Sequence, residues 1–203
     1  MASPSPSSSI VRSPRARNAA ATRSAILAAA CRQFARESYE NVGLREIGRE
    51  AGVDPALICR YFGSKESLFR EVLHADHDES LLDGVDAAGL PARLASLIVD
   101  VCEGEGDPEQ RAAKMERLLI ILRSASSPNA SAIASEAIDE DFIAPLVARL
   151  DGEEARLRAS LALSVLIGSV IVRKMMSLSS MEVNQERART RLTALLEKAL
   201  APA

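Results

Sequence analysis

The clearest pattern of apolar and polar positions in this chain predicts two short helices on either side of residue 52. Leu44, Ile47 and Ala51 fall at i, i+3 and i+7, which places them on one face of a helix. The next residue, Gly52, can adopt the left-handed backbone that ends a helix without steric cost. Asp54 followed by proline is typical of an N-cap and the first helical position, so a second helix is expected to begin at residue 55.

This second helix, over residues 55–62, has an inward pair and an outward group of side chains. Ile58 and Phe62 lie four residues apart and are expected to pack on the first helix, so the two helices and their glycine turn form a helix-turn-helix. The positions left facing outward are Ala56, Leu57, Cys59, Arg60 and Tyr61. Apolar and basic side chains exposed together suit a DNA groove, although an ordinary helical hairpin in a bundle has the same spacing.

Helical periodicity continues on both sides of this motif and predicts an all-α chain of roughly nine helices. The other expected helices cover residues 19–37, 65–78, 91–103, 108–124, a segment that Ser127-Pro128 opens and that includes 142–150, and residues 153–176 and 183–200. Pro145 is expected to kink or restart its helix, because proline lacks the N–H that continues the hydrogen-bond ladder. The helix over 153–176 is expected to be the longest.

The helix over residues 153–176 is apolar on nearly all sides and needs more cover than its own subunit easily supplies. Six apolar or small residues of this helix recur at intervals of 4, 3, 4, 3 and 4 residues, so they lie along one side of it. The last helix is expected to add two leucines to the same face. We expect this face to form a homodimer interface, made of Leu157, Leu161, Ser164, Gly168, Ile171, Met175, Leu192 and Leu195. A membrane span is not expected, because the longest apolar run, residues 161–172, is shorter than the roughly 20 residues that a bilayer requires.

Charge is distributed unevenly along the chain, and the difference changes the expected partner. The net charge of the whole chain is −3. Residues 1–65 hold 10 Lys and Arg against 5 Asp and Glu, which leaves a net charge of −8 on residues 66–203. A basic end on an acidic body favours DNA as a partner of the basic end.

This asymmetry supports three segments. Residues 1–18 are rich in Ser and Pro and are expected to form a disordered basic arm, which either stays solvated or follows DNA phosphates through Arg12, Arg15 and Arg17. Residues 19–65 are expected to be the DNA-binding domain, and residues 66–203 a helical domain for dimerisation and effector binding.

Several kinds of chemistry find no support in the sequence. The three cysteines are odd in number and far apart, so neither a disulfide scaffold nor a zinc site is expected, and the compartment is taken to be the reducing cytoplasm. His74, His77 and Asp78 have helical spacing for a metal, but a solvated helix end is the preferred interpretation. There is no glycine-rich phosphate loop or nucleophile–base pair, so we expect no enzyme, no cofactor and no metal.

Residues 22–69 resemble the DNA-binding domain of the TetR family of one-component transcriptional repressors. The matching positions are Arg23, Ile26, Leu27, Ala29, Ala30, Phe34, Tyr39, Arg45, Ile47, Ala51-Gly52-Val53, Arg60-Tyr61-Phe62, Ser64-Lys65-Glu66 and Leu68. The chain departs from the family pattern at Ser38, Gly43, Gly48 and Cys59, where glycine, Ser or Thr, alanine and tyrosine are usual. Within a helix, Gly48 is expected to cost about 0.5–1 kcal/mol relative to alanine.

The resemblance implies a dimeric transcriptional repressor that binds a palindromic operator in double-stranded DNA. Together with the pattern of outward residues, it predicts the DNA-binding set Arg12, Arg15, Arg17, Arg45, Pro55, Ala56, Leu57, Cys59, Arg60, Tyr61 and Lys65. A ligand-free architectural DNA binder, and a helical bundle that has lost DNA binding, remain as alternatives.

The resemblance also implies an effector pocket in the second domain, where Phe142 is the only aromatic residue after Phe69. The pocket is expected among Leu94, Ile98, Cys102, Met115, Leu119, Leu122 and Phe142. Stacked aromatic rings usually hold flat cations. The sequence therefore favours a flexible aliphatic or mixed-polar effector, with a closed core as the equal alternative.

Overall fold

The computed structural model describes residues 14–75, 82–103, 108–176 and 184–202. Within these ranges all of the regular secondary structure is helical. Four helices form what we call the head: α1 (Pro14–Arg36), α2 (Leu44–Ala51), α3 (Pro55–Phe62) and α4 (Lys65–His74). The rest form the body: α5 (Leu90–Glu103), α6 (Pro108–Ser124), α7 (Pro128–Ile138), α8 (Ala144–Val147), α9 (Ala155–Val170) and α10 (Gln185–Leu200), with π turns η1 (Asp139–Ile143) and η2 (Ile171–Met175).

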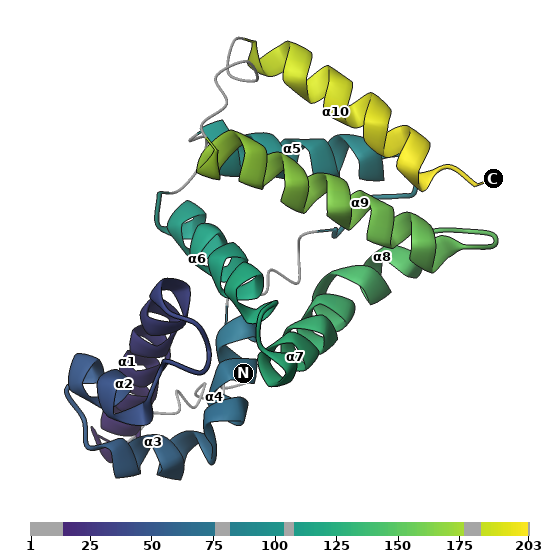
Figure 1. Cartoon of the computed structure of the whole chain (residues 1–203). Coiled ribbons are helices and arrows are strands. Elements are labelled where there is room, and N and C mark those ends of the chain that lie inside the picture. Colours follow the sequence, from purple (N-terminus) through teal and green to yellow (C-terminus); the bar gives the residue numbers. More distant parts are fainter. Residues whose placement is uncertain (1–13, 76–81, 104–107, 177–183, 203) are drawn as a thin grey trace, which may run out of the picture.

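Figure 1 shows the head at one end of the molecule and α5, α9 and α10 at the other, with α6 and α7 between them. The all-α expectation is confirmed. If α7–η1–α8 and α9–η2 are each taken as one interrupted helix, the described residues form nine helices.

Most helix boundaries agree with the local signals, and the start of α1 does not. The bounds of α2 and α3 are the expected ones, and Ser64 and Ser127 cap α4 and α7 by accepting hydrogen bonds from the backbone N–H groups of Ser67 and Ala130. However, α1 begins at Pro14 rather than residue 19. At 23 residues it is longer than α9 and η2 together, so the expectation that the 153–176 helix is the longest was wrong.

Pro145 restarts its helix as expected, and the backbone adapts just before it. Proline has no N–H, and its ring crowds the carbonyl group four residues earlier, at position 141. The chain responds with the π turn η1, in which the hydrogen-bond ladder widens, before α8 continues.

Two hydrophobic cores organise the chain. The first joins α1–α4 to one end of α6 and to α7, through Ile120, Ala130, Ile133, Ala134 and Ala137. At its centre the rings of Phe34, Tyr39 and Phe69 lie 4.8–5.8 Å apart between centroids. The second core joins α5, α8, α9 and α10 and is aliphatic, with Phe142 packed at its edge.

Candidate nucleic-acid interface and dimer face

The turn between α2 and α3 is built from local backbone contacts. Gly52 ends α2 with φ +68° and ψ +32°, the left-handed region that a glycine adopts without strain. Asp54 is the N-cap of α3, where its Oδ1 accepts a 2.7 Å hydrogen bond from the backbone N–H of Ala56. Together they set the angle at which α3 leaves α2, as the sequence predicts.

Gly48, which departs from the family pattern, has a structural role in this turn. A Cβ atom at this position would lie 2.9 Å from the carbonyl oxygen of Val53 and 3.3 Å from Cγ of Pro55. The backbone N–H of Val53 donates a 2.9 Å hydrogen bond to the carbonyl oxygen of Gly48. The missing side chain therefore lets the turn fold tightly over α2, which offsets the conformational cost of glycine in a helix.

The outward face of α3 is narrower than the spacing predicted. Ile58 and Phe62 are buried as expected, and Ala56, Cys59 and Arg60 are exposed. By contrast, Leu57, Tyr61 and Pro55 are half-buried, and Tyr61 packs against the first core. Leu57 and Tyr61 therefore face outward only in part, because α3 packs against α4 as well as against α2.

The three cations expected near DNA lie in different environments. Arg45 on α2 and Arg60 on α3 are exposed. Lys65 is partly buried, donates a hydrogen bond from Nζ to the carbonyl oxygen of Tyr39, and lies 4.2 Å from the centroid of the Tyr39 ring. Burial lowers the pKa of Lys65. Burial, followed by the charge of Glu66, raises the pKa of Tyr39 to about 12. Lys65 thus ties α4 to the loop before α2.

The basic arm is only partly described. Arg12 lies outside the described residues. Arg15 and Arg17 fall within the bounds of α1, so residues 14–18 are helical rather than a disordered arm.

Polar contacts connect the head to the body at the end of α4. Arg70 forms an ion pair with Glu136 of α7, with 2.6 Å between Nη1 and Oε2. His74 Nδ1 lies 3.0 Å from Oδ1 of Asp141 in η1, and Arg117 of α6 reaches the same carboxylate at 2.5 Å. His74 is therefore part of an interdomain contact. His77 and Asp78, the other members of the candidate metal set, lie outside the described residues.

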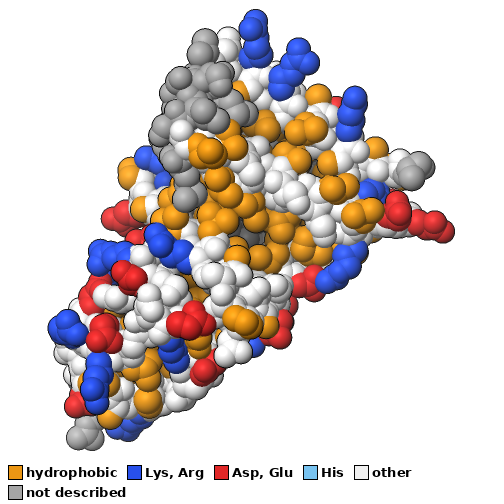
Figure 2. Space-filling model, viewed as in Figure 1, with side chains coloured by type: hydrophobic (Ala, Val, Ile, Leu, Met, Phe, Trp, Pro, Cys, Tyr) orange, Lys and Arg blue, Asp and Glu red, His pale blue; other side chains and the backbone are white. Residues whose placement is uncertain are grey.

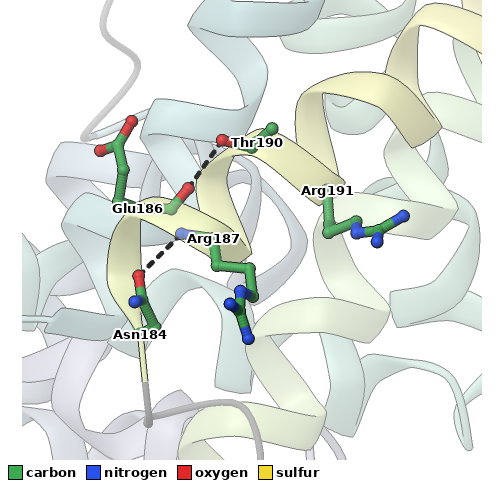
Figure 3. Close-up of a pocket in the computed structure, with 5 residues that line it drawn as sticks. All are labelled: Asn184, Glu186, Arg187, Thr190 and Arg191. Atoms are coloured by element: carbon green, nitrogen blue, oxygen red, sulfur yellow. Dashed lines mark hydrogen bonds between the residues drawn. The ribbon is translucent and has the colours of Figure 1, made fainter.

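The expected pocket residues do not form one group. Leu94 and Ile98 are fully buried in the second core, and Cys102, Met115 and Phe142 pack against it. Leu119 packs against the first core instead, and Leu122 is half-buried. An open depression of about 480 Å³ lies elsewhere, at the start of α10, and is lined by Asn184, Glu186, Arg187, Thr190 and Arg191 (Figure 3).

The expected dimer face is largely uncovered in the single chain. Leu157, Leu161 and Leu195 are 52%, 47% and 50% exposed. Ser164 is exposed, and an added Cβ at Gly168 would meet nothing within 4 Å. Figure 2 shows hydrophobic side chains gathered over this side of the body, where α9 lies in front.

Three other members of the expected face differ. Leu192 is 5% exposed and belongs to the second core, so its placement at an interface was wrong. It lies on the side of α10 that packs against its own subunit. Ile171 is half-buried, and the side chain of Met175 lies outside what the structure describes.

By length and composition alone, one helix of the described chain, Ala155–Arg173, could cross a membrane, and 22% of its apolar window is buried. This helix is longer than the apolar run of residues 161–172 on which the expectation of no membrane span was based. A helix at the core of a water-soluble bundle passes the same test, and this one holds the buried Arg158, whose Nη1 donates a 2.9 Å hydrogen bond to the carbonyl oxygen of Leu200.

Comparison with protein-family models shows which family this chain is similar to. Residues 26–72 match the family model described as bacterial regulatory proteins, tetR family. Residues 88–200 match the model described as tetracyclin repressor-like, C-terminal domain, which alone covers more than half of the chain. Among curated proteins, no sequence matches this chain.

Several solved structures share the fold. GusR of Salmonella enterica is 22% identical, with 88% of this chain and 95% of that chain covered and a TM-score of 0.63. NalD, the secondary repressor of the MexAB-OprM multidrug efflux pump in Pseudomonas aeruginosa, is 17% identical, with 91% and 97% covered and a TM-score of 0.63. EbrR, a multidrug binding protein complexed with imidazole, is 22% identical, with 89% and 90% covered and a TM-score of 0.56.

Proposed function

The chain belongs to the tetR family of bacterial regulatory proteins, and from this we propose that it is a cytoplasmic repressor that binds a palindromic operator as a homodimer. The observation that carries the proposal is the exposure of Ala56, Cys59 and Arg60 on α3, at the far end of the head from the body (Figure 1). A helix with its turn held by caps on both sides can enter a major groove as a rigid unit.

The exposed residues suggest separate roles at the DNA. Arg60 has the length and donors for a bidentate contact with guanine, and Ala56 suits a thymine methyl group. Arg45, on α2, is proposed to contact phosphate and so to position the head without reading sequence. Lys65 is proposed to hold the head in shape through Tyr39 and to reach phosphate only secondarily, because its Nζ already donates to a backbone carbonyl.

A ligand-responsive mechanism is proposed through the contacts at the end of α4. Asp141 lies in η1 beside Phe142 and holds both His74 and Arg117. A small molecule that entered the second core near Phe142 would displace η1 and with it α4. Coupling of this kind typically amounts to about 1–3 kcal/mol between the two sites. Because the second core is aliphatic, the proposed effector is a flexible aliphatic or mixed-polar compound.

Operator binding tests the first part of the proposal. Arg60→Ala is expected to weaken binding to the cognate operator by about 1–3 kcal/mol and binding to random DNA far less. Arg49→Ala is the matched control, because Arg49 is an exposed arginine of the same motif that lies 3.4 Å from Glu46. Equal losses on both DNAs would assign Arg60 to phosphate positioning.

A thermal-shift screen tests the second part. Acyl or other aliphatic compounds are expected to raise the melting temperature and to release the operator. Tight binding of a planar aromatic cation would contradict the proposed effector class and leave the DNA-binding proposal intact.

A further inference from the structure

The exposed face of α9 and α10 has opposite charges at its two ends. The two helices run antiparallel, because Nη1 of Arg158, near the start of α9, donates to the carbonyl oxygen of Leu200, at the end of α10. Beside that contact lies an acidic end, which has a net negative charge and where Asp151, Glu153, Glu154 and Glu197 are exposed. The exposed cations there are Lys198 and Arg156, and Arg156 is already paired with Asp139. At the other end of the pair lies a basic end, formed by the exposed Arg187 and Arg191.

The basic end is a defined local structure. Asn184 caps α10, where its Oδ1 accepts a 2.9 Å hydrogen bond from the backbone N–H of Arg187. Arg187 and Arg191 are one helical turn apart. Glu186 is the acid beside them within the described residues, and Figure 3 shows its side chain pointing away from that of Arg187.

Between the two ends the face is apolar and open. Leu157 and Leu161 of α9 and Leu195 of α10 are each about half exposed. Apolar side chains at the centre with opposite charges at the ends give a surface that can be complementary to a second copy of itself.

The position of the head determines which ends meet. A single operator duplex requires both α3 helices on the same side of a dimer. The two-fold axis must therefore run from body to head, across α9 and α10, which lie crosswise at the far end of the molecule (Figure 1). A two-fold axis perpendicular to a helix pair reverses its direction in the second copy. The acidic end of one chain then faces the basic end of the other.

We propose that, in the proposed homodimer, pairing of the acidic end of one chain with the basic end of the other sets the orientation of the two copies. The inference rests on the proposed dimeric DNA-binding function and adds to it the pairing of the ends. An axis parallel to the helices would place like charges together at both ends, so the same charges oppose the orientation that cannot bind one duplex.

Charge exchange between the two ends tests the proposal. One variant, Arg187→Glu with Arg191→Glu, would have two acidic ends, and another, Glu153→Arg with Glu154→Arg, two basic ends. Each is expected to dimerise at least about tenfold more weakly than the natural chain in dilution series by analytical ultracentrifugation at low salt. An equimolar mixture of the two is expected to form a heterodimer close to natural affinity, and to regain operator binding.

Two controls keep the outcome interpretable. Arg45→Glu with Arg49→Glu makes the same change in net charge as the Arg187 and Arg191 variant. These residues lie on α2, far from the face, so dimerisation is expected to stay unchanged. Combining all four end substitutions in one chain restores opposite ends and is expected to restore the homodimer. High salt should reduce the difference between the variants and the natural chain.

Each result separates the inference from the function on which it rests. Dimerisation of either double variant at natural affinity, or a mixture no stronger than its components, would overturn the pairing of the ends and leave a dimeric DNA-binding protein. A natural chain that stays monomeric while bound to its operator would overturn the proposed dimer itself.

Discussion

The head and the body of this chain reach their stability in different ways. In the head, Phe34, Tyr39 and Phe69 meet at the centre of the first core, and the ends of α2, α3 and α4 are closed by Gly52, Asp54 and Ser64. The body has an aliphatic core and leaves half of the surface of several leucines in water. The head completes its core with help from α6 and α7, whereas the body leaves part of its apolar surface uncovered in the single chain.

Removing one aromatic ring from each region should break this comparison most clearly. Phe69 is 1% exposed, and its centroid lies 4.8 Å from that of Phe34. Phe69→Ala is expected to lower the free energy of unfolding by about 3–5 kcal/mol, because the cavity cannot be refilled by the other rings. Denaturant unfolding measures the loss.

Phe142→Ala is the matched control in the body, where the ring is only half-buried. A loss about half as large or less is expected there. Equal losses would show that the body depends on its aromatic residue as much as the head does, and the contrast would not hold.

The open face of the body gives the next largest expected effect. Leu157→Glu with Leu161→Glu is expected to weaken the dimer by about 3 kcal/mol, roughly a hundredfold, because four half-exposed leucines lose their remaining burial. Sedimentation across a dilution series measures it. Ala132→Glu with Ser135→Glu, on the exposed side of α7, adds the same charge as a control.

The stability of the monomeric variant shows whether these two leucines belong to an interface or to the core of the single chain. Because Leu157 and Leu161 already face water in the single chain, unfolding of the monomeric variant should be nearly unchanged. A large loss of monomer stability would mean that these leucines belong to the body's own core.

Two glycines, one in the head and one in the body, are expected to respond to alanine with smaller and opposite changes in stability. Gly48→Ala is expected to destabilise the head by about 1 kcal/mol, because the new Cβ would lie 2.9 Å from a backbone oxygen that must move. Gly168→Ala, measured in the monomeric variant, is expected to stabilise the body by up to about 1 kcal/mol, because that Cβ meets nothing within 4 Å. Thermal unfolding of both variants tests the signs, and stabilisation by Gly48→Ala would contradict the close approach in the turn.

The smallest expected effect is the pH dependence of the head. The 2.5 Å hydrogen bond from Arg32 is the main cause that lowers the pKa of Glu50, and Gln33 contributes a second hydrogen bond. A lowered pKa in the folded state means that the ionised form stabilises the head at neutral pH. This stabilisation is lost as the pH falls through the unfolded value of about 4.5 toward the folded one.

Acid unfolding of the natural chain and of Glu50→Gln measures this effect. At neutral pH the natural chain is expected to have a larger free energy of unfolding than Glu50→Gln. This difference is expected to disappear below about pH 4.5. A constant difference across the acid range would show that the charge of Glu50 contributes nothing.

The departures from sequence-based expectation follow a pattern. Residues 14–18 were expected to be disordered from their composition, and Pro14 instead occupies a first helical position, where proline suits a helix. Leu119 was assigned to a pocket in the body, and α6 turns it to the head. In each case a neighbouring element distant in sequence, or the continuation of a helix, decided the outcome.

The sequence by itself determined most of the helices and several of their ends, because a cap, a glycine turn or an apolar repeat acts within a few residues. Gly52, Asp54, Ser64 and Ser127 act in this way, and the family pattern of the head depends on the same short spacings. Only the tertiary structure decided which face of each helix is covered. Leu192 and Leu195 have the same apolar character and lie less than one turn apart, yet α5 and α9 bury the first and leave the second exposed. Likewise, His74 meets Asp141 across 67 residues, a contact between side chains that no local period encodes.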